Sequence, residues 1–288
     1  MRLDELVAEL DAYFRVPDVR GDTRWSEFWD ARGATYWREF VEPEYPERHD
    51  GLMVRGDETV ERAATCVFPS DTIVASLEPR TFLFSEHPVD LLDEPGFQPL
   101  ARESFERMRE LGISFYHVHG PLDQHPEISP SRLIAQALGL RNLQEFAPFV
   151  EGIPGGAVVS GESDVTLDEL ARRLGEYLGP EIPVEVVARH RDEAGHVAVA
   201  AGGGADAPFL EQAIERGCHT YVTGNAATRC RLDFVQESVG AFKARAEEAR
   251  VSVIDATHYG TEKPPQLAMV EWFTRRGLPA EFLPDGPK

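Results

Sequence analysis

The sequence predicts an α/β fold built from two α/β subdomains with mixed or parallel sheets. From residue 51 onward, apolar runs of strand length alternate with amphipathic stretches of helical period. A second series with the same alternation follows the proline- and glycine-rich stretch APFVEGIPGG (147–156), whose composition is typical of a boundary. We therefore expect an N-terminal half over residues 1–148 and a C-terminal half over residues 149–288.

The individual elements follow from local patterns. The first residues, MRLDELVAELDAYF, form an acidic amphipathic helix and lack the basic start of a signal peptide. In the first half we expect strands over 62–68, 81–85 and 113–117, and helices over 70–78, 100–111 and 130–138. In the second half we expect strands over 156–160, 184–189, 196–201, 219–223, 251–256 and 279–283. Helices are expected there over 166–178, 207–216, 231–249 and 264–276. Such alternation favours parallel pairing, which brings the carboxyl ends of several strands together.

Residues 22–46 form an unusually aromatic segment. Within it, RWSEFWDARGATYWREF (24–40) contains Trp25, Trp29 and Trp37, three of the four tryptophans of the chain. Aromatic residues at this spacing are more often part of a core than of a binding surface. The alternative is a lid over a site or a subunit contact, because aromatic residues are enriched at interfaces.

Composition excludes several classes of protein. The chain has 29 basic and 50 acidic residues, and its formal charge of −21 repels nucleic acid and anionic membranes. No stretch approaches the ~20 apolar residues that cross a bilayer. Cys66, Cys218 and Cys230 are odd in number and widely spaced, which predicts reduced thiols and a cytoplasmic location. We expect the partner to be a small-molecule substrate.

Three expected strand ends present ionisable side chains. They are FLFSEHPVD (82–90), YHVHGPLD (116–123) and THYGTE (257–262). Carboxylates and neutral imidazoles are the mixed oxygen and nitrogen donors that zinc, iron(II) and manganese accept. Because parallel strands bring these ends together, the motifs predict a metal site at strand ends between the two halves. The candidate side chains are those of Glu86, His87, His117, His119, Asp123, His258 and Glu262.

The local settings of these residues lead to further expectations. Glu86 and His87 lie between a core strand and Pro88, so we expect them at a rigid, water-accessible edge. His258 and Glu262 are four residues apart, so they share a helical face or flank a tight turn. The segment AAGGGAD (200–206) either binds a phosphate or forms a strand-to-helix turn. We favour the turn, because its terminal aspartate would repel an anion.

The three motifs also resemble those of a known family, in the same order along the chain. SEHPVD (85–90) resembles an HHP segment, HGPLD (119–123) an H-T-N-L-D segment, and THYGTE (257–262) a G-H-Y-x-T-E segment. These are motifs of the dinuclear metal-centre hexameric family, also called NGG-interacting-factor-three-like. Its members are often labelled GTP cyclohydrolase I type 2 homologues. Further matches between residues 50 and 284 are DGLMVRG, VAVAAGGGADAPFL and YVTG.

The resemblance implies roles for individual residues. The implied metal ligands are His87, Asp123, His258 and Glu262, with Asp123 and Glu262 as bridges. His119 is implied as a neighbour of the ligands or as a catalytic proton shuttle. Glu86 stands where the family has its first histidine. As a ligand it would be harder and anionic and would favour oxygen-preferring metals; if it does not bind, the site would be mononuclear.

The resemblance further implies a divalent-metal-dependent hydrolase that forms a homo-oligomer, a hexamer. It would use two zinc, iron or manganese ions per chain and a metal-bound water to attack a nucleotide, phosphoester or cyclic substrate. The alternative is a non-enzymatic metal-binding scaffold or metal-delivery protein. A dinucleotide-binding oxidoreductase fits the α/β alternation, but the chain lacks the glycine fingerprint of that class.

The acidic excess predicts adaptation to a salt-rich cytoplasm. Lysine occurs only at positions 243, 263 and 288, which a GC-rich genome alone explains, but base composition does not explain the excess of carboxylates. At about 1 M salt the Debye length falls to ~3 Å, so repulsion among surface carboxylates is screened.

We expect the thermal unfolding midpoint to rise steeply as KCl increases from about 0.1 to about 2 M, because screening removes this repulsion. Circular dichroism melts measure the midpoint, and sorbitol at equal osmolality is the control for non-ionic solvent effects. A midpoint that stays flat across this range contradicts the prediction.

Overall fold

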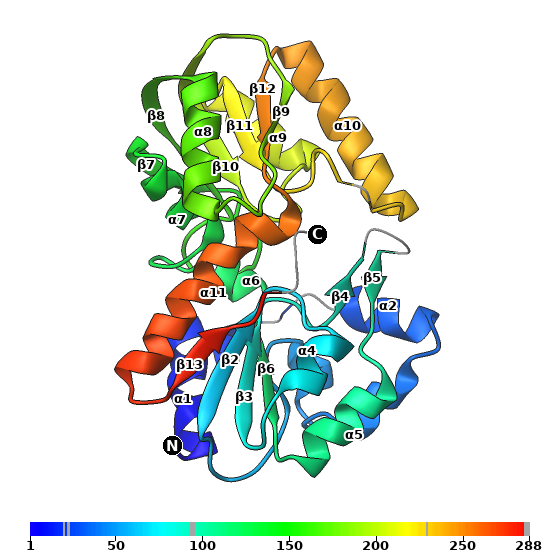
Figure 1. Cartoon of the computed structure of the whole chain (residues 1–288). Coiled ribbons are helices and arrows are strands. Elements are labelled where there is room, and N and C mark those ends of the chain that lie inside the picture. The colour runs from blue at the N-terminus through cyan, green and yellow to red at the C-terminus, as the bar shows by residue number, and fades with distance from the viewer. Residues whose placement is uncertain (20, 22–23, 93–95, 229, 285–288) are drawn as a thin grey trace.

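Two β-sheets, each covered by helices on both faces, form two lobes that a long helix connects (Figure 1). The computed structural model describes residues 1–288 except residues 20, 22–23, 93–95, 229 and 285–288. The predicted α/β class with mixed and parallel sheets is confirmed. No helix in the described ranges is long and apolar enough to cross a membrane.

The first sheet has the strand order β1-β6-β3-β2-β13. Its strands are β1 (Gly51–Val54), β2 (Arg62–Cys66), β3 (Thr81–Ser85), β6 (Ser114–His117) and β13 (Ala280–Phe282). All neighbours pair in parallel except β1, which is antiparallel to β6. Ser85 pairs with His117, so β3 and β6 end at the same level of the sheet. This register brings two of the three predicted motifs together.

Alternating side chains of β3 anchor the sheet in two cores. Phe82 and Phe84 pack beneath α1 (Leu3–Phe14) and the end of α11 (His258–Arg275). Leu83 points to the opposite face, toward α4 (Asp71–Ser76) and α5 (Arg102–Glu110). Because both faces are covered, β3 is apolar throughout its centre, and its polar residues follow its carboxyl end.

The aromatic segment contributes mainly to the core beside α5. It contains α2 (Arg24–Ala31), η2 (Thr35–Glu39) and α3 (Tyr45–Arg48), and η1 (Val16–Asp18) precedes it. Trp29 and Trp37 are each 2% exposed, and their ring centroids are 5.7 Å apart. The core prediction is confirmed for these two residues. Trp25 instead contacts two of the candidate imidazoles; residues 22 and 23 lie outside the described residues.

The second sheet has the order β7-β8-β10-β11-β12-β9. Its strands are β7 (Arg141–Phe146), β8 (Val158–Thr166), β9 (Glu185–Ala188), β10 (Glu193–Ala200), β11 (Thr220–Thr223) and β12 (Ser252–Asp255). β10, β11 and β12 are parallel to one another. One face packs on α7 (Pro130–Ala137) and α8 (Leu167–Leu178), the other on α9 (Ala207–Glu215) and α10 (Asp233–Ala249).

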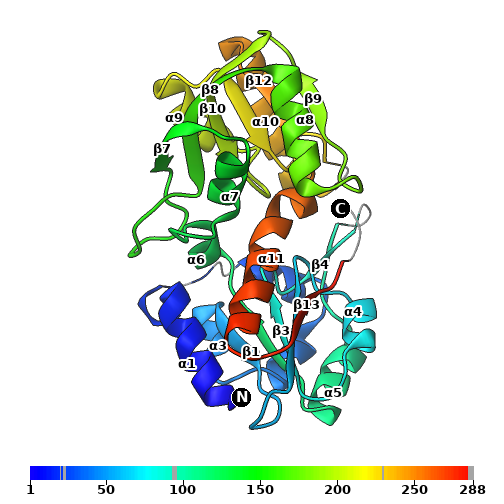
Figure 2. The ribbon, with the colours of Figure 1, turned by 60° about the vertical axis from the view of Figure 1, so that its left-hand side comes forward.

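The end of the chain returns to the first sheet. After β12, α11 runs from the second lobe to the first, and β13 then pairs with β2 (Figures 1 and 2). Residues after 149 therefore complete the first sheet, while a division into domains at residue 148 stays a prediction. Two short elements lie close to the site: α6 (Gly120–Asp123) and the hairpin of β4 (Asp90–Leu91) and β5 (Phe97–Gln98).

Helix α11 begins at His258, six residues before the predicted start at 264. Pro264 and Pro265 suggest a helix start because proline fits the first turn. The Thr257 hydroxyl instead caps the helix by accepting a hydrogen bond from the Gly260 amide at 3.0 Å. This earlier start places the whole THYGTE motif at the amino end of a helix.

Candidate metal centre

The end of β3 fixes Glu86 and His87. The His87 amide donates to the Val67 carbonyl at 3.2 Å, and the Ser85 hydroxyl donates to the His87 carbonyl. The imidazole of His87 stacks on Phe68 with ring centroids 4.3 Å apart and planes within 4°. Both the backbone and the ring of His87 are therefore held in place, as a metal ligand requires.

The end of β6 leads into α6, which positions His119 and Asp123. Asp50, at the start of the DGLMV motif, accepts a hydrogen bond from the His119 amide at 2.9 Å. The Asp123 amide donates to the His119 carbonyl at 3.0 Å, which closes the short helical turn. As a result the His119 Nε2 atom lies 3.7 Å from Asp123 Oδ2.

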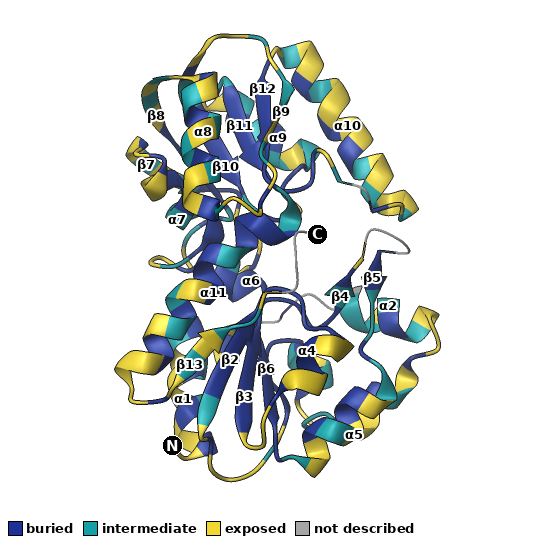
Figure 3. Cartoon of the chain, in the orientation of Figure 1, coloured by how far each residue is buried: buried dark blue, intermediate teal, exposed yellow. Residues whose placement is uncertain are grey.

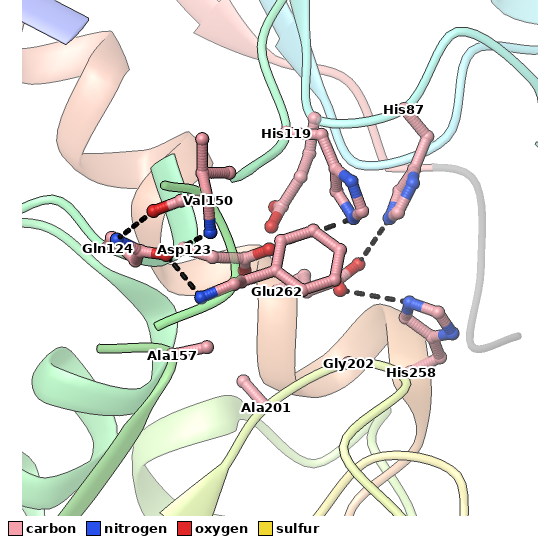
Figure 4. A network of polar contacts seen from close by, with 12 residues as sticks. His87, His119, Asp123, Gln124, Val150, Ala157, Ala201, Gly202, His258 and Glu262 are labelled. Atoms are coloured by element: carbon pink, nitrogen blue, oxygen red, sulfur yellow. Dashed lines mark hydrogen bonds and ion pairs between the residues drawn. The ribbon is translucent and has the colours of Figure 1, made fainter. Parts of the chain in front are cut away.

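Helix α11 presents His258, Glu262 and Gln266, spaced four residues apart, on one face. The Glu262 carboxylate lies between two imidazoles: its Oε2 is 2.7 Å from His87 Nε2, and its Oε1 is 2.9 Å from His258 Nε2. Figure 4 shows the two rings approaching this carboxylate from different directions. Gln266 donates to Glu86 Oε2 at 3.2 Å.

The candidate ligands form two groups that share Glu262. One group contains His87, His258 and Glu262, and the other contains Glu86, Asp123 and Glu262; in each, the donor atoms lie within 4.8 Å of one another. The structure thus brings together all five predicted ligands, with His119 beside them. His117 belongs to neither group, and its Nδ1 is 3.0 Å from the Tyr45 hydroxyl.

The end of β3 is buried rather than water-accessible, while Asp123 and His258 in the same cluster are partly exposed (Figure 3 shows the buried ends of the strands). Glu86 is 0% and His87 1% exposed, so the expected exposed edge is wrong. The reason is that Trp25 and Glu262 of α11 pack against His87 at the end of β3. The ring of Trp25 lies 5.4 Å from that of His87 and 5.9 Å from that of His119.

Burial and mutual repulsion shape the ionisation of the carboxylates. Burial raises the pKa of Glu86 well above its usual value, and repulsion from Glu262 and Asp123 adds to this. The pKa of Asp123 is raised in the same way by burial and by the charges of Glu262 and Asp50. Burial also acts to raise the pKa of Glu262, but His258 and His87 hold it below its usual range.

The donor set fits divalent cations. Three carboxylates converge, two of them buried and Asp123 partly exposed, and Glu86 Oε1 has no hydrogen-bond partner among the described residues. A buried carboxylate is costly unless it is paired or coordinates a metal. The residues therefore supply the negative charge and the free donor atom that a cation would satisfy.

The glycine-rich segment 200–206 packs behind the cluster. It is a strand-to-helix turn, because β10 ends at Ala200 and Asp206 caps α9 by accepting from the Phe209 amide at 3.1 Å. Gly202 has a φ of +59°, and a Cβ at this position would collide with Glu262 Oε1. Only glycine gives this oxygen its space.

Sequence reasoning missed three supporting residues, Asp50, Gln266 and Gly202, and for Trp25 it favoured a core position over the alternative of a lid over a site. Asp50 lies within a quoted motif, but its bond to a backbone amide has no sequence signature. Gln266 follows Glu262 at helical spacing, a signal that the late predicted start of α11 concealed. Gly202 and Trp25 approach the cluster through tertiary packing alone.

Comparison with known proteins identifies the family. The model of the family described as Duf34/NIF3 (NGG1p interacting factor 3) matches residues 34–278. The chain belongs to this family. The resemblance seen in the three motifs is therefore confirmed.

Several relatives named "GTP cyclohydrolase 1 type 2 homolog" are similar to the chain. The protein from Pyrococcus horikoshii is 31% identical over 226 residues, which are 76% of this chain and 82% of the relative. The protein from Halobacterium salinarum is 30% identical over 228 residues, which are 74% of this chain and 80% of the relative.

Solved structures share the fold. The protein ybgI, described as of unknown function, superposes with a TM-score of 0.69 at 21% identity over 100% of both chains. TTHA1606 from Thermus thermophilus gives a TM-score of 0.63 at 24% identity over 100% of this chain and 99% of its own. At these identities the similarity concerns the fold alone.

We expect Gly202→Ala to weaken metal binding by about tenfold or more, because the new methyl group displaces Glu262 from its two histidines. Titration calorimetry of the metal-free protein measures the affinity. Gly277→Ala is the matched control, since Gly277 also has a positive φ, +78°, but has nothing within 4 Å of its Cβ position. Equal losses in the two variants would mean that backbone strain alone is responsible.

In chelator, we expect Glu86→Gln to raise the unfolding midpoint at neutral pH by about 2 °C or more, corresponding to roughly 1 kcal/mol. The raised pKa of Glu86 means that its charged form destabilises the folded metal-free protein. The gain over wild type should therefore grow as pH rises above the ordinary value of 4.5 and vanish below it.

Thermal melts between about pH 4.5 and 8 test this dependence. Glu281→Gln, which removes an exposed carboxylate from β13, is the control and should show no such gain. A pH-independent difference between Glu86→Gln and wild type would argue against a raised pKa at this position.

Proposed function

We propose that the chain is a divalent-metal-dependent hydrolase with two metal ions per chain. The observation that supports this proposal is the sharing of Glu262 between two groups of donors, His87 with His258 and Glu86 with Asp123. A carboxylate common to two groups can bridge two cations. The relatives named GTP cyclohydrolase 1 type 2 homologues agree with such an activity without establishing it.

Each position would be held by residues from different parts of the fold. Imidazoles from β3 and α11 face the first position, and carboxylates from β3 and α6 face the second. When bound, two divalent ions would polarise a substrate and lower the pKa of a water between them. The chain itself would orient the ligands through Phe68, Asp50 and Gln266 and exclude bulk water through burial.

His119 is suited to accept or relay a proton. Its ring lies between Trp25 and Phe149, with centroid distances of 5.9 and 5.3 Å, and its Nε2 faces Asp123. The side chain is neither a member of the two donor groups nor far from them. A positioned imidazole of this kind typically contributes about 10²–10⁴-fold to a hydrolytic rate.

The proposal extends to substrate, assembly and location. The substrate class is a nucleotide, phosphoester or cyclic compound, following the names of the relatives. The acidic surface argues against nucleic acid as a partner. We propose a homo-hexamer in the cytoplasm, adapted to high salt.

Asp123→Asn should lose metal and hydrolytic activity together, because it removes one of the negative charges that converge on the carboxylate position. His119→Gln should retain metal but lose about 10²–10⁴-fold in rate. Elemental analysis gives the metal content, and a panel of GTP, cyclic nucleotides and bis(p-nitrophenyl) phosphate gives the activity.

His196→Gln is the matched control for His119→Gln, because His196 lies on β10 outside the cluster. Wild-type activity that survives complete metal removal would rule out the proposal. Bound metal without hydrolysis of any compound in the panel would instead favour the metal-binding scaffold or delivery protein.

A further inference from the structure

We infer that the two metal positions are chemically unlike and that the chain holds two different ions. The position formed by Glu86, Asp123 and Glu262 would take a hard, oxygen-preferring ion such as Mn²⁺. The position formed by His87, His258 and Glu262 would take a borderline ion such as Zn²⁺. This inference rests on the proposed two-metal site and names the metal at each position.

The difference follows from the donor atoms. The first group offers carboxylate oxygens only, whereas the second offers two imidazole nitrogens and one carboxylate. Carboxylate sets suit Mg²⁺, Ca²⁺ and Mn²⁺, and imidazole suits zinc, copper, iron and nickel. Because Glu262 belongs to both groups, the contrast between the positions is produced by the other four residues.

Because of Glu86, all donor atoms at the carboxylate position are oxygen atoms. Its Oε2 accepts from Gln266 at 3.2 Å, while its buried Oε1 has no hydrogen-bond partner in the described part of the chain. Gln266 is in turn fixed by its backbone, whose carbonyl accepts from the Thr65 hydroxyl at 3.0 Å. One oxygen is thus positioned by the protein and the other is left free for a cation.

A bound cation would also relieve the cost of burying charge at this position. Glu86 and Glu262 are 0% and 2% exposed, so water cannot solvate their charge. Two divalent cations would more than balance the three carboxylates, whereas a single ion on the histidine side would leave Glu86 and Asp123 uncompensated. A hard dication is the natural counter-ion for this group.

The test measures occupancy by two ions in sequence. Metal-free protein in high salt receives one equivalent of Zn²⁺, and Mn²⁺ is then titrated while electron paramagnetic resonance measures free Mn²⁺. We expect about one Mn²⁺ to bind per chain without release of zinc, which elemental analysis after dialysis verifies. This order is needed because Zn²⁺ binds most sites more tightly than Mn²⁺.

Three variants locate the manganese. Glu86→Gln should lose Mn²⁺ binding and retain one Zn²⁺, which also shows that it is folded. Glu86→His should take a second Zn²⁺ and bind Mn²⁺ at least about tenfold more weakly. Gln266→Leu, which removes the amide that donates to Glu86, should weaken Mn²⁺ about 10–100-fold and leave zinc unchanged. Glu281→Gln is the surface control.

The outcomes separate this inference from the proposed function. If a second Zn²⁺ binds wild type as tightly as the first and displaces Mn²⁺, or if Glu86→His changes neither affinity, the inference is overturned while a two-metal hydrolase remains possible. If no metal binds under any condition, both the inference and the proposed function fail. Hydrolysis with either metal pair does not decide the question, because the readout is occupancy.

Discussion

The contact of the Glu262 carboxylate with two imidazoles is the interaction on which the site depends. His87 follows β3 of the first sheet, whereas His258 and Glu262 begin α11, directly after β12 of the second sheet. One buried carboxylate therefore joins the carboxyl ends of both sheets. The path of α11 back to the first sheet, where β13 pairs with β2, makes this geometry possible.

Charge is the constraint that accompanies this contact. Glu262 is balanced by its histidines, but Glu86 and Asp123 meet mainly one another and the same carboxylate. A fold that places Glu86 and Asp123 beside Glu262 accepts repulsion among carboxylates, and such destabilising arrangements are typical of functional sites. The divalent cations that we propose for this site would supply compensating charge from outside the chain.

The packing around the cluster turns this charge into a defined geometry. Phe68 stacks on the ring of His87 and Trp25 makes an edge contact with it, Asp50 holds the backbone of His119, and Gly202 leaves room for Glu262. These residues come from distant positions in the chain. They position the candidate ligands and are not ligands themselves. Rigid ligands of unlike chemistry are what the proposed distinction between two metals requires.

The sequence by itself determined the α/β class and most elements, because hydrophobic periodicity is a local property. The strand-end motifs suggested a metal site, and their resemblance to the family singled out the five candidate ligands. Only the tertiary structure decided that β13 joins the first sheet, that Glu86 is fully buried, and that Glu262 belongs to two donor groups. Burial and the convergence of side chains depend on which distant segments pack together, and no local pattern encodes that.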